Sequence, residues 1–274
     1  MNRRVFACLA GVGAFGIALT TAPSASAIVG GTPVADGKWP FMAQIEQQLD
    51  DGSWEHRCGA ALIDKRVVAT AAHCLMPDLS KDRIRLVLGR TDANSPGGTV
   101  VNKDRFSAYR IPFSTQTNTD LALLVLDRSV KQKTAALPPL NTRPQPGQLL
   151  HVAGWGRTIL EDPNSRPTRM REAMLPVTEF NTEGGMWSKE FICAGTEETR
   201  VAGRDSGGPL FSTTKSGKTV VHGLVTGETN TCTGLFTNLG DPTIWEPFRK
   251  PLASHGLAHV LPKAAKTVTE QPVG

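Results

Sequence analysis

The sequence predicts an all-β protein made of two β units. Short apolar runs recur along the chain and are separated by turn residues, which is typical of strands. Residues 83–88 alternate polar and apolar side chains, as a half-buried strand does. Four prolines crowd residues 134–148, so we interpret this stretch as a connector between the two units.

The chain begins with a predicted signal peptide, residues 1–27. Arg3 and Arg4 give a positive start, an apolar run follows, and Ala25-Ser26-Ala27 has the small residues that signal peptidase reads. The apolar run is shorter than a membrane-spanning helix requires. General secretion and twin-arginine export both remain open, and the leader is of a bacterial style. We therefore expect a secreted, bacterial protein.

The strands expected after the leader fall into two groups. The expected strands are 41–45, 58–63, 67–71, 83–89 and 121–126, then 149–154, 191–193, 220–225 and 235–239. We place the first unit at residues 28–137 and the second at 138–261. Residues 245–259 are expected to form a short C-terminal helix with Pro247 in its first turn, and residues 262–274 a loose tail.

Charge and cysteine content narrow the function. The formal net charge is +5, and removing the leader takes two arginines away, which is too mild to indicate nucleic-acid or membrane binding. An even number of cysteines in an exported chain favours disulfides over metal or redox chemistry. Spacing alone leaves three pairings open for the four that remain: Cys58, Cys74, Cys193 and Cys232.

Three distant motifs together indicate hydrolysis with a serine nucleophile. They are Ala-Ala-His73-Cys, Asp120-Leu-Ala-Leu-Leu and Gly-Arg-Asp-Ser206-Gly-Gly-Pro-Leu. Serine is a poor nucleophile at neutral pH, so it needs a neighbouring base, and the base needs a carboxylate that orients it. A lone His or Asp is usually an ordinary loop residue, which is our interpretation of the other histidines: His56, His151, His222, His255 and His259.

With these motifs in their order, residues 28–250 resemble the chymotrypsin-like, or trypsin-like, serine endopeptidases. The resemblance implies two six-stranded antiparallel β-barrels with the active site between them. It implies that His73 is the general base, that Asp120 orients it and that Ser206 attacks the scissile carbonyl. The first barrel would carry His73 and Asp120, and the second would carry Ser206.

The same resemblance implies further roles. It pairs Cys58 with Cys74, and by elimination from the family pattern we expect a less usual bridge between Cys193 and Cys232. It implies that Asp205 pairs with the α-ammonium group of the mature N-terminus, which orders the oxyanion hole. Ile28 would be that terminus if cleavage follows Ala27, so export itself would activate the protein.

The chain departs from the family pattern at three places. Arg204 stands where the family has the glycine whose N–H forms the oxyanion hole with Ser206, and a side chain makes that backbone conformation costly. Arg200 stands where a trypsin has aspartate in the specificity pocket, so a preference for an acidic residue there is one alternative. The substrate-binding wall is also changed, since it reads Thr226, Gly227, Glu228.

We therefore expect a secreted serine endopeptidase that works through an acyl-enzyme without cofactor or metal. Its expected partners are polypeptide substrates and a protein inhibitor, and we expect a monomer that binds neither nucleic acid nor, after leader removal, membranes. A serine-protease-like binding protein that lost turnover through Arg204 is the first alternative. An esterase with the same triad is the second.

Overall fold

The computed structural model describes residues 28–75, 83–111, 119–179 and 189–265. The predicted signal peptide, residues 1–27, and the last part of the predicted tail, residues 266–274, lie outside the described residues. Among the helices of the described ranges, none is both long and apolar enough to cross a membrane.

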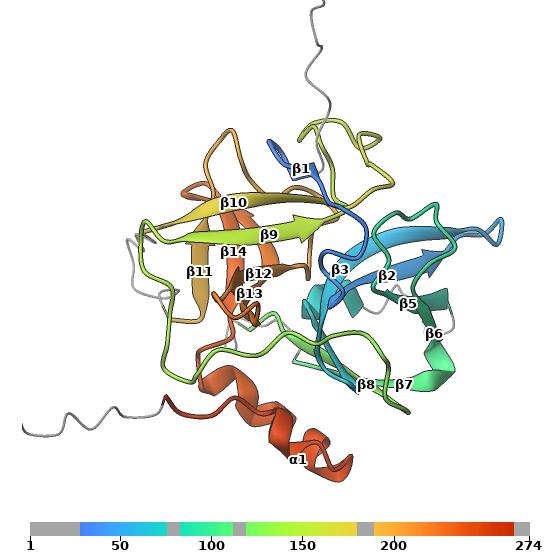
Figure 1. Ribbon diagram of the computed structural model, residues 1–274, viewed down its shortest axis with the longest axis vertical. Helices are drawn as coiled ribbons and strands as arrows, with labels where there is room; N and C mark the ends of the chain where they lie inside the picture. Colours follow the sequence, from blue (N-terminus) through green and yellow to red (C-terminus); the bar gives the residue numbers. More distant parts are fainter. Residues whose placement is uncertain (1–27, 76–82, 112–118, 180–188, 266–274) are drawn as a thin grey trace, which may run out of the picture.

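The described chain forms two antiparallel sheets that lie side by side (Figure 1). The first has the strand order β6-β5-β2-β3-β4-β8-β7. Its strands are β2 (Met42–Gln48), β3 (Trp54–Asp64), β4 (Val67–Thr70), β5 (Ile84–Leu88), β6 (Thr99–Asn102), β7 (Phe106–Arg110) and β8 (Ala122–Leu126). The strands β6 and β7 at its two edges are joined by only one helical turn, η3 (Lys103–Arg105). The sheet is therefore a curled barrel in which β6 and β7 act as one bent strand.

The second sheet closes completely. Its order is β1-β10-β11-β14-β13-β12-β9, and β10 also pairs with β9, which completes a ring of six strands. Its strands are β1 (Thr32–Pro33), β9 (Leu149–Gly154), β10 (Arg171–Thr178), β11 (Phe191–Ala194), β12 (Pro209–Thr213), β13 (Thr219–Thr229) and β14 (Cys232–Asn238). The predicted fold of two antiparallel barrels is confirmed, with β1 as a short addition to the second ring.

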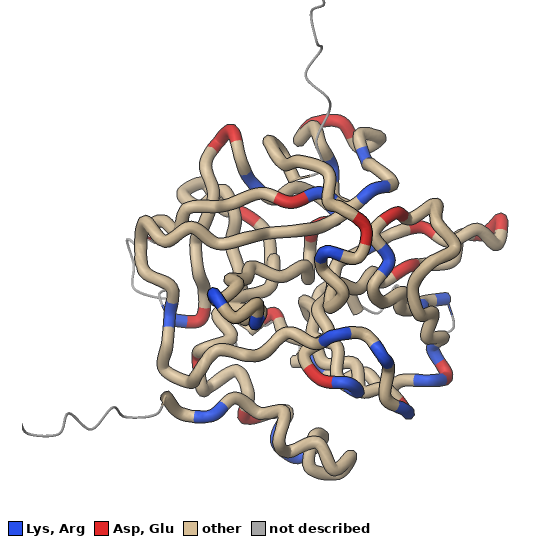
Figure 2. The backbone as a smooth tube through the Cα atoms, viewed as in Figure 1, with Lys and Arg blue, Asp and Glu red and all other residues tan. Residues whose placement is uncertain are grey.

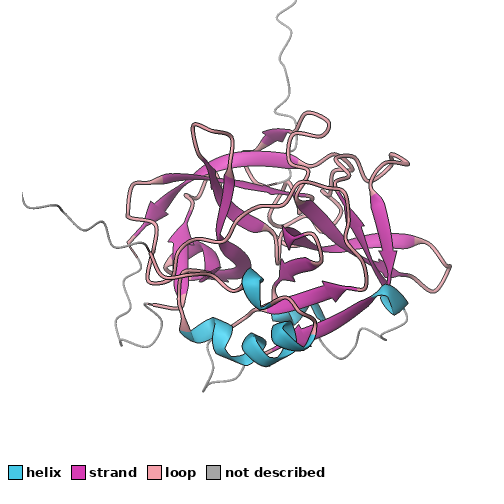
Figure 3. Cartoon of the chain, turned by 60° about the horizontal axis from the view of Figure 1, so that its bottom comes forward, coloured by secondary structure: helices cyan, strands magenta, loops and turns pink. Residues whose placement is uncertain are grey.

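The predicted C-terminal helix is confirmed as α1 (Glu246–Ser254), flanked by the turns η4 (Thr243–Trp245) and η5 (Ala258–Val260). Pro247 lies in the first turn, where its missing N–H has no intrahelical partner to lose. Most of the helical turns lie along one side of the molecule (Figure 3). Phe248 and Leu252 are buried in a hydrophobic cluster that draws most of its residues from the first barrel and some from the second, so the helix fastens the end of the chain to this shared core.

The N-terminal end of the described chain packs on the second barrel, and the C-terminal end pairs with the connector. Ile28 is buried among side chains of the second barrel, and β1 pairs with β10. After α1, Ala264 pairs with Leu140 of the connector. Acidic and basic residues are interspersed over both barrels (Figure 2). The barrels are thus tied together by crossing segments as well as by apolar contacts such as Phe41 with Phe211, whose ring centroids are 5.1 Å apart.

Candidate active site

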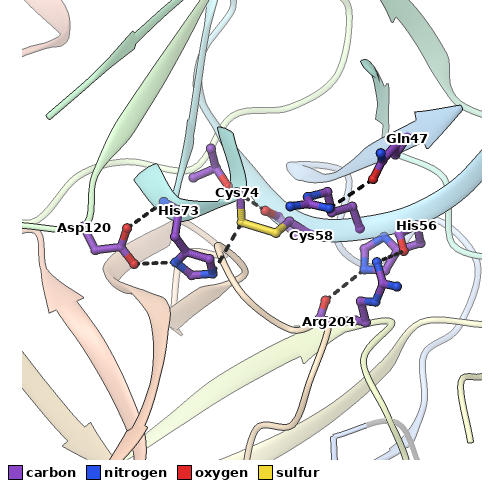
Figure 4. Close-up of a disulfide and its surroundings, with 10 residues drawn as sticks. Gln47, His56, Cys58, His73, Cys74, Asp120 and Arg204 are labelled. Atoms are coloured by element: carbon purple, nitrogen blue, oxygen red, sulfur yellow. Dashed lines mark hydrogen bonds and ion pairs between the residues drawn. A yellow bond between two sulfur atoms is a disulfide. The ribbon is translucent and has the colours of Figure 1, made fainter. Parts of the chain in front are cut away.

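His73 and Asp120 meet at the ends of two neighbouring strands. His73 lies in the short turn η1 (Ala72–Leu75) after β4, and Asp120 precedes β8, the strand that pairs with β4. The His73 Nδ1 atom lies 2.7 Å from Asp120 Oδ2, and the His73 backbone N–H donates to Oδ1 at 2.9 Å (Figure 4). The buried carboxylate therefore holds both the ring and the backbone of His73. This leaves Nε2 directed away from the carboxylate.

Asp120 is supported from the second barrel by two threonines. The Thr237 hydroxyl donates to the Asp120 backbone carbonyl at 3.3 Å and lies 2.9 Å from the Thr226 hydroxyl. Thr226 was expected in the substrate-binding wall. Here its hydroxyl contacts Leu224 and Thr237 instead. Thr237 has no sequence signal, since a threonine within a strand is ordinary.

Ser206 lies in a loop anchored to both barrels. Gly59 of β3 donates its N–H to the Ser206 carbonyl at 2.8 Å, and the next residue, Gly207, donates to Val225 of β13 at 2.7 Å. Gly207 has a φ of 75°, and a Cβ there would lie 2.2 Å from the Thr70 hydroxyl, so only glycine fits. Among the described residues, the hydrogen bonds of His73 do not include one from the Ser206 hydroxyl. Such bonds often tighten only when substrate binds.

Arg204 has the left-handed backbone conformation that normally favours glycine, with a φ of 80°. The His56 ring holds it, because Nε2 lies 3.0 Å from the Arg204 carbonyl. In return the Arg204 guanidinium donates to the His56 carbonyl at 3.4 Å and lies 3.6 Å from Glu55. We call this reciprocal pair the His56–Arg204 clasp (Figure 4).

Desolvation keeps His56 neutral, and the hydrogen bonds of its two ring nitrogens fix the tautomer. Desolvation lowers the pKa of His56 to about 4, so the ring is uncharged at neutral pH. Because Nε2 faces a carbonyl, it carries the proton, and Nδ1 accepts from the Gln44 amide at 3.3 Å. Gln44 is in turn held by the buried Arg90. Sequence reasoning took His56 for an ordinary loop residue, and only its neighbours in space show otherwise.

Asp205 is a buried carboxylate, and the groups that donate to it within the described ranges belong to the backbone. Its oxygens accept from the N–H of Gly156 at 2.9 Å and of Ala202 at 3.0 Å. A Cβ on Gly154 or Gly156 would lie 2.3 Å from this carboxyl group, so glycine is required at both positions. Burial raises the pKa of Asp205 to about 7. A cation placed nearby would strongly stabilise the charged form of this buried carboxyl group.

Ile28 is buried in the second barrel, in the same region as the Asp205 loop. The next residue, Val29, forms a bridge with Arg200, a few residues before Asp205. Ile28 has a φ of 53°, which is a strained conformation for a β-branched residue whose nitrogen is part of a peptide bond. The described contacts include no ion pair between Ile28 and Asp205.

A cavity of about 360 Å³ lies beside Ser206. Small and apolar residues make up much of its wall, and three charged residues join them. The lining consists of Arg157, Leu160, Glu161, Val201, Ala202, Gly203, Ser206, Val225, Gly227 and Glu228. Of the expected substrate-binding residues, Gly227 and Glu228 line the cavity, whereas Arg200 and Thr226 do not. The Arg200 guanidinium is bound by Glu228 and, at 3.0 Å, by Glu197.

The described part of the chain contains two disulfides. One joins Cys58 to Cys74 and so links β3 to the turn that carries His73 (Figure 4). The other joins Cys193 of β11 to Cys232 of β14. Cys58, His73 and Cys74 also form a group of three side chains whose ligand atoms lie close enough together for a metal ion. Because the two sulfur atoms are bonded to each other, the group does not fit a thiolate metal site.

Comparison with known proteins places this geometry in a family. Residues 28–240 match the family described as Trypsin. The human chymotrypsin-like elastase family member 3A is 28% identical over 240 residues, covering 82% of this chain and 84% of the relative. The human member 3B is 29% identical over 215 residues, covering 73% of this chain and 77% of the relative. The chain therefore belongs to the trypsin family of serine endopeptidases.

Proposed function

We propose that the protein is a secreted endopeptidase that cleaves polypeptides through Ser206, His73 and Asp120. One observation carries the proposal: the buried Asp120 carboxylate holds the ring and the backbone of His73 in the barrel that also anchors the Ser206 loop. Asp120 thereby fixes the proton on Nδ1, and Nε2 remains free to accept the proton of the Ser206 hydroxyl.

The reaction then follows from these positions. Ser206 Oγ attacks the scissile carbonyl as His73 Nε2 takes its proton. The N–H groups of Arg204 and Ser206 stabilise the oxyanion, and His73 passes the proton to the leaving amine. Water then hydrolyses the acyl-enzyme by the same route, with His73 as the base.

The His56–Arg204 clasp supports turnover over the alternative of an inactive binding protein. A non-glycine residue in a left-handed conformation costs roughly 1–2 kcal/mol. Here the ring of His56 and the guanidinium of Arg204 hold that conformation from two sides. The Arg204 N–H lies in the peptide whose carbonyl, that of Gly203, accepts from the Arg157 N–H at 2.8 Å, so this bond and the clasp together support the N–H in its place for an oxyanion.

Activation by the Ile28 amine is part of the proposal. Two observations support it: a buried carboxyl of Asp205 that a cation would stabilise, and a strained φ at Ile28 that disappears when the preceding peptide bond is cut. The freed ammonium group would move to Asp205. Full activity after acetylation of the Ile28 amine would contradict this mechanism.

The cavity beside Ser206 favours a small or medium-sized apolar side chain before the cleaved bond. Val201, Ala202 and Val225 supply apolar surface there. The charge of Arg200 is already bound by Glu197 and Glu228, so it gives little support to an acidic preference. The names of the two human relatives, both chymotrypsin-like elastases, agree with an apolar preference.

Hydrolysis of matched substrates tests the proposed function. The protein beginning at Ile28 is assayed on a peptide library and on esters of the same acyl groups, with Ser206→Ala as the control. Cleavage of peptides that is lost in the variant is expected. Cleavage of esters alone would favour the esterase alternative, and no turnover by folded protein would favour the binding protein.

A further inference from the structure

Four arginines surround the loop that carries Ser206. Arg57 follows His56 on β3, Arg157 follows the second barrel's Gly154-Trp155-Gly156 segment, Arg166 lies in the loop before β10, and Arg204 lies two residues before Ser206. We call these four residues the arginine cluster. Arg166 and Arg204 both contact one carboxylate, that of Glu55. Two guanidinium groups thus share a single carboxylate, and one of them belongs to the loop that carries Ser206.

Arg157 brings a further positive charge to the same loop. Its backbone N–H donates to the Gly203 carbonyl at 2.8 Å. A Cβ built on Gly203 would lie 3.2 Å from Arg157 Nε, so the side chain lies across this glycine. Nε is buried and has no hydrogen-bond partner among the described residues. Arg157 also lines the cavity beside Ser206.

The charges of the cluster act on one another. Burial is the main cause that lowers the pKa of the Arg204 guanidinium, and the carboxylate of Glu55 opposes it. The other three arginines of the cluster lower that pKa further. Mutual repulsion of this kind is relieved when an external anion binds among the cations.

The cluster lies where the leaving half of a substrate would run. His73 gives its proton to the leaving amine, so the chain beyond the cut starts at His73. The Cys74 sulfur lies 3.9 Å from His73 Nε2, and its disulfide partner Cys58 directly follows Arg57. Figure 4 shows the disulfide between His73 on one side and His56 with Arg204 on the other. A peptide that leaves over the disulfide therefore reaches the arginine cluster.

The cavity that would receive the side chain before the cleaved bond offers no comparable group of cations. Glu161 and Arg157 both line it, and Glu228, which also lines it, is bound by Arg200. We propose that the arginine cluster selects substrates that carry aspartate or glutamate within the first few residues after the cleaved bond. Guanidinium groups bind carboxylates with two parallel hydrogen bonds, which gives this selection both strength and geometry.

This inference rests on the proposed function, and its test separates the two. Two quenched fluorescent peptides share one acyl half and differ by glutamate or glutamine at the second and third positions after the cleaved bond. A nitroanilide of the same acyl half has no residues there. We expect wild-type kcat/KM to favour the glutamate peptide by roughly tenfold, and this preference to shrink at high salt.

Charge removal assigns the preference to the cluster. The double variant Arg157→Gln/Arg166→Gln should bring the glutamate-to-glutamine ratio close to one. The matched control is Arg249→Gln, which removes a positive charge from the exposed face of α1 and should keep the wild-type ratio. A wild-type ratio of one, or an equal loss in the control, overturns the inference while nitroanilide turnover upholds the proposed function. No turnover of any substrate overturns the proposed function and the inference with it.

Discussion

At the scale of single residues, the arginine before the Asp205-Ser206 pair is the feature that most needs explanation. Arg204 takes a conformation that suits glycine, and the half-buried, neutral His56 holds its carbonyl. The chain thus combines an unfavourable backbone conformation with a side-chain pair that opposes it. The cost and its compensation belong to one structural unit.

The effect of replacing His56 on kcat should depend on the residue at position 204. In His56→Ala we expect kcat to fall by roughly 10²-fold with less change in KM, because the positive φ of Arg204 loses its support and relaxation of that residue moves its N–H away from the oxyanion. The loss should be much smaller when the same change is made in the Arg204→Gly background, since glycine adopts a positive φ without help. Steady-state kinetics on the four proteins of this cycle measure the coupling. Equal losses in both backgrounds would rule out the clasp.

Asp205 predicts a pH dependence of stability for the form in which Ile28 is not the terminus. Burial raises its pKa to about 7 in the folded chain, above the ordinary value of an aspartate. Since the folded pKa is the higher one, folding is favoured most at acidic pH, and this stabilisation is lost as the pH rises through about 7. A free Ile28 ammonium would offset the loss by pairing with the carboxylate.

Melting temperatures test this sign. The protein beginning at Ala27 should lose stability relative to the protein beginning at Ile28 as the pH rises from about 4 to about 8. In Asp205→Asn the difference between the two forms should no longer depend on pH over this range. Parallel profiles for the two unsubstituted proteins would show that Asp205 does not respond to the Ile28 amine.

At the scale of elements, the two disulfides differ in what they join. Cys58–Cys74 spans 16 residues and holds the turn of His73, whereas Cys193–Cys232 links two strands of the second barrel. We expect replacement by alanine to cost about 3 kcal/mol of unfolding free energy for the first pair and about 4 kcal/mol for the second, which closes a longer loop, as measured by urea denaturation. Only loss of the first pair should also lower kcat strongly. A similar fall in kcat for both pairs would contradict a positioning role for Cys58–Cys74.

Most strands could be predicted, and those that were missed have physical reasons. Strands with continuous apolar runs, such as β4 and β8, are recognisable because both of their faces are buried. β10 contains Pro176 and charged residues at its start, and it becomes a strand because it closes the ring between β9 and β11. β12 directly follows Gly207-Gly208 and is set by its pairing with β13. Such pairings depend on the whole barrel.

The residues of the candidate site divide in a similar way. His73, Asp120, Ser206 and Asp205 stand in motifs that the sequence displays. His56, Thr237 and Arg157 do not, because each gains its place only when strands from different parts of the chain come together. The cavity wall is intermediate, since Gly227 and Glu228 were expected there and Arg200 is instead held by two glutamates.

At the scale of the whole molecule, the site depends on the junction of two barrels. Asp120 and His73 belong to the first barrel, the Ser206 loop is bonded to both, and Thr237 of the second barrel supports Asp120. The segment from Ile28 to Pro33 packs on the second barrel before the chain enters the first. We therefore expect the state of the N-terminus to be coupled to the Ser206 loop.

The most direct measurement is covalent labelling of the protein beginning at Ile28 with a fluorophosphonate, followed by intact mass. We expect one adduct, which is absent in Ser206→Ala and forms much more slowly in the protein beginning at Ala27. This result would require a working base, a formed oxyanion hole and a free Ile28 amine together. No adduct on folded protein with a free Ile28 amine would contradict the account, because Ser206 would then not be an activated nucleophile.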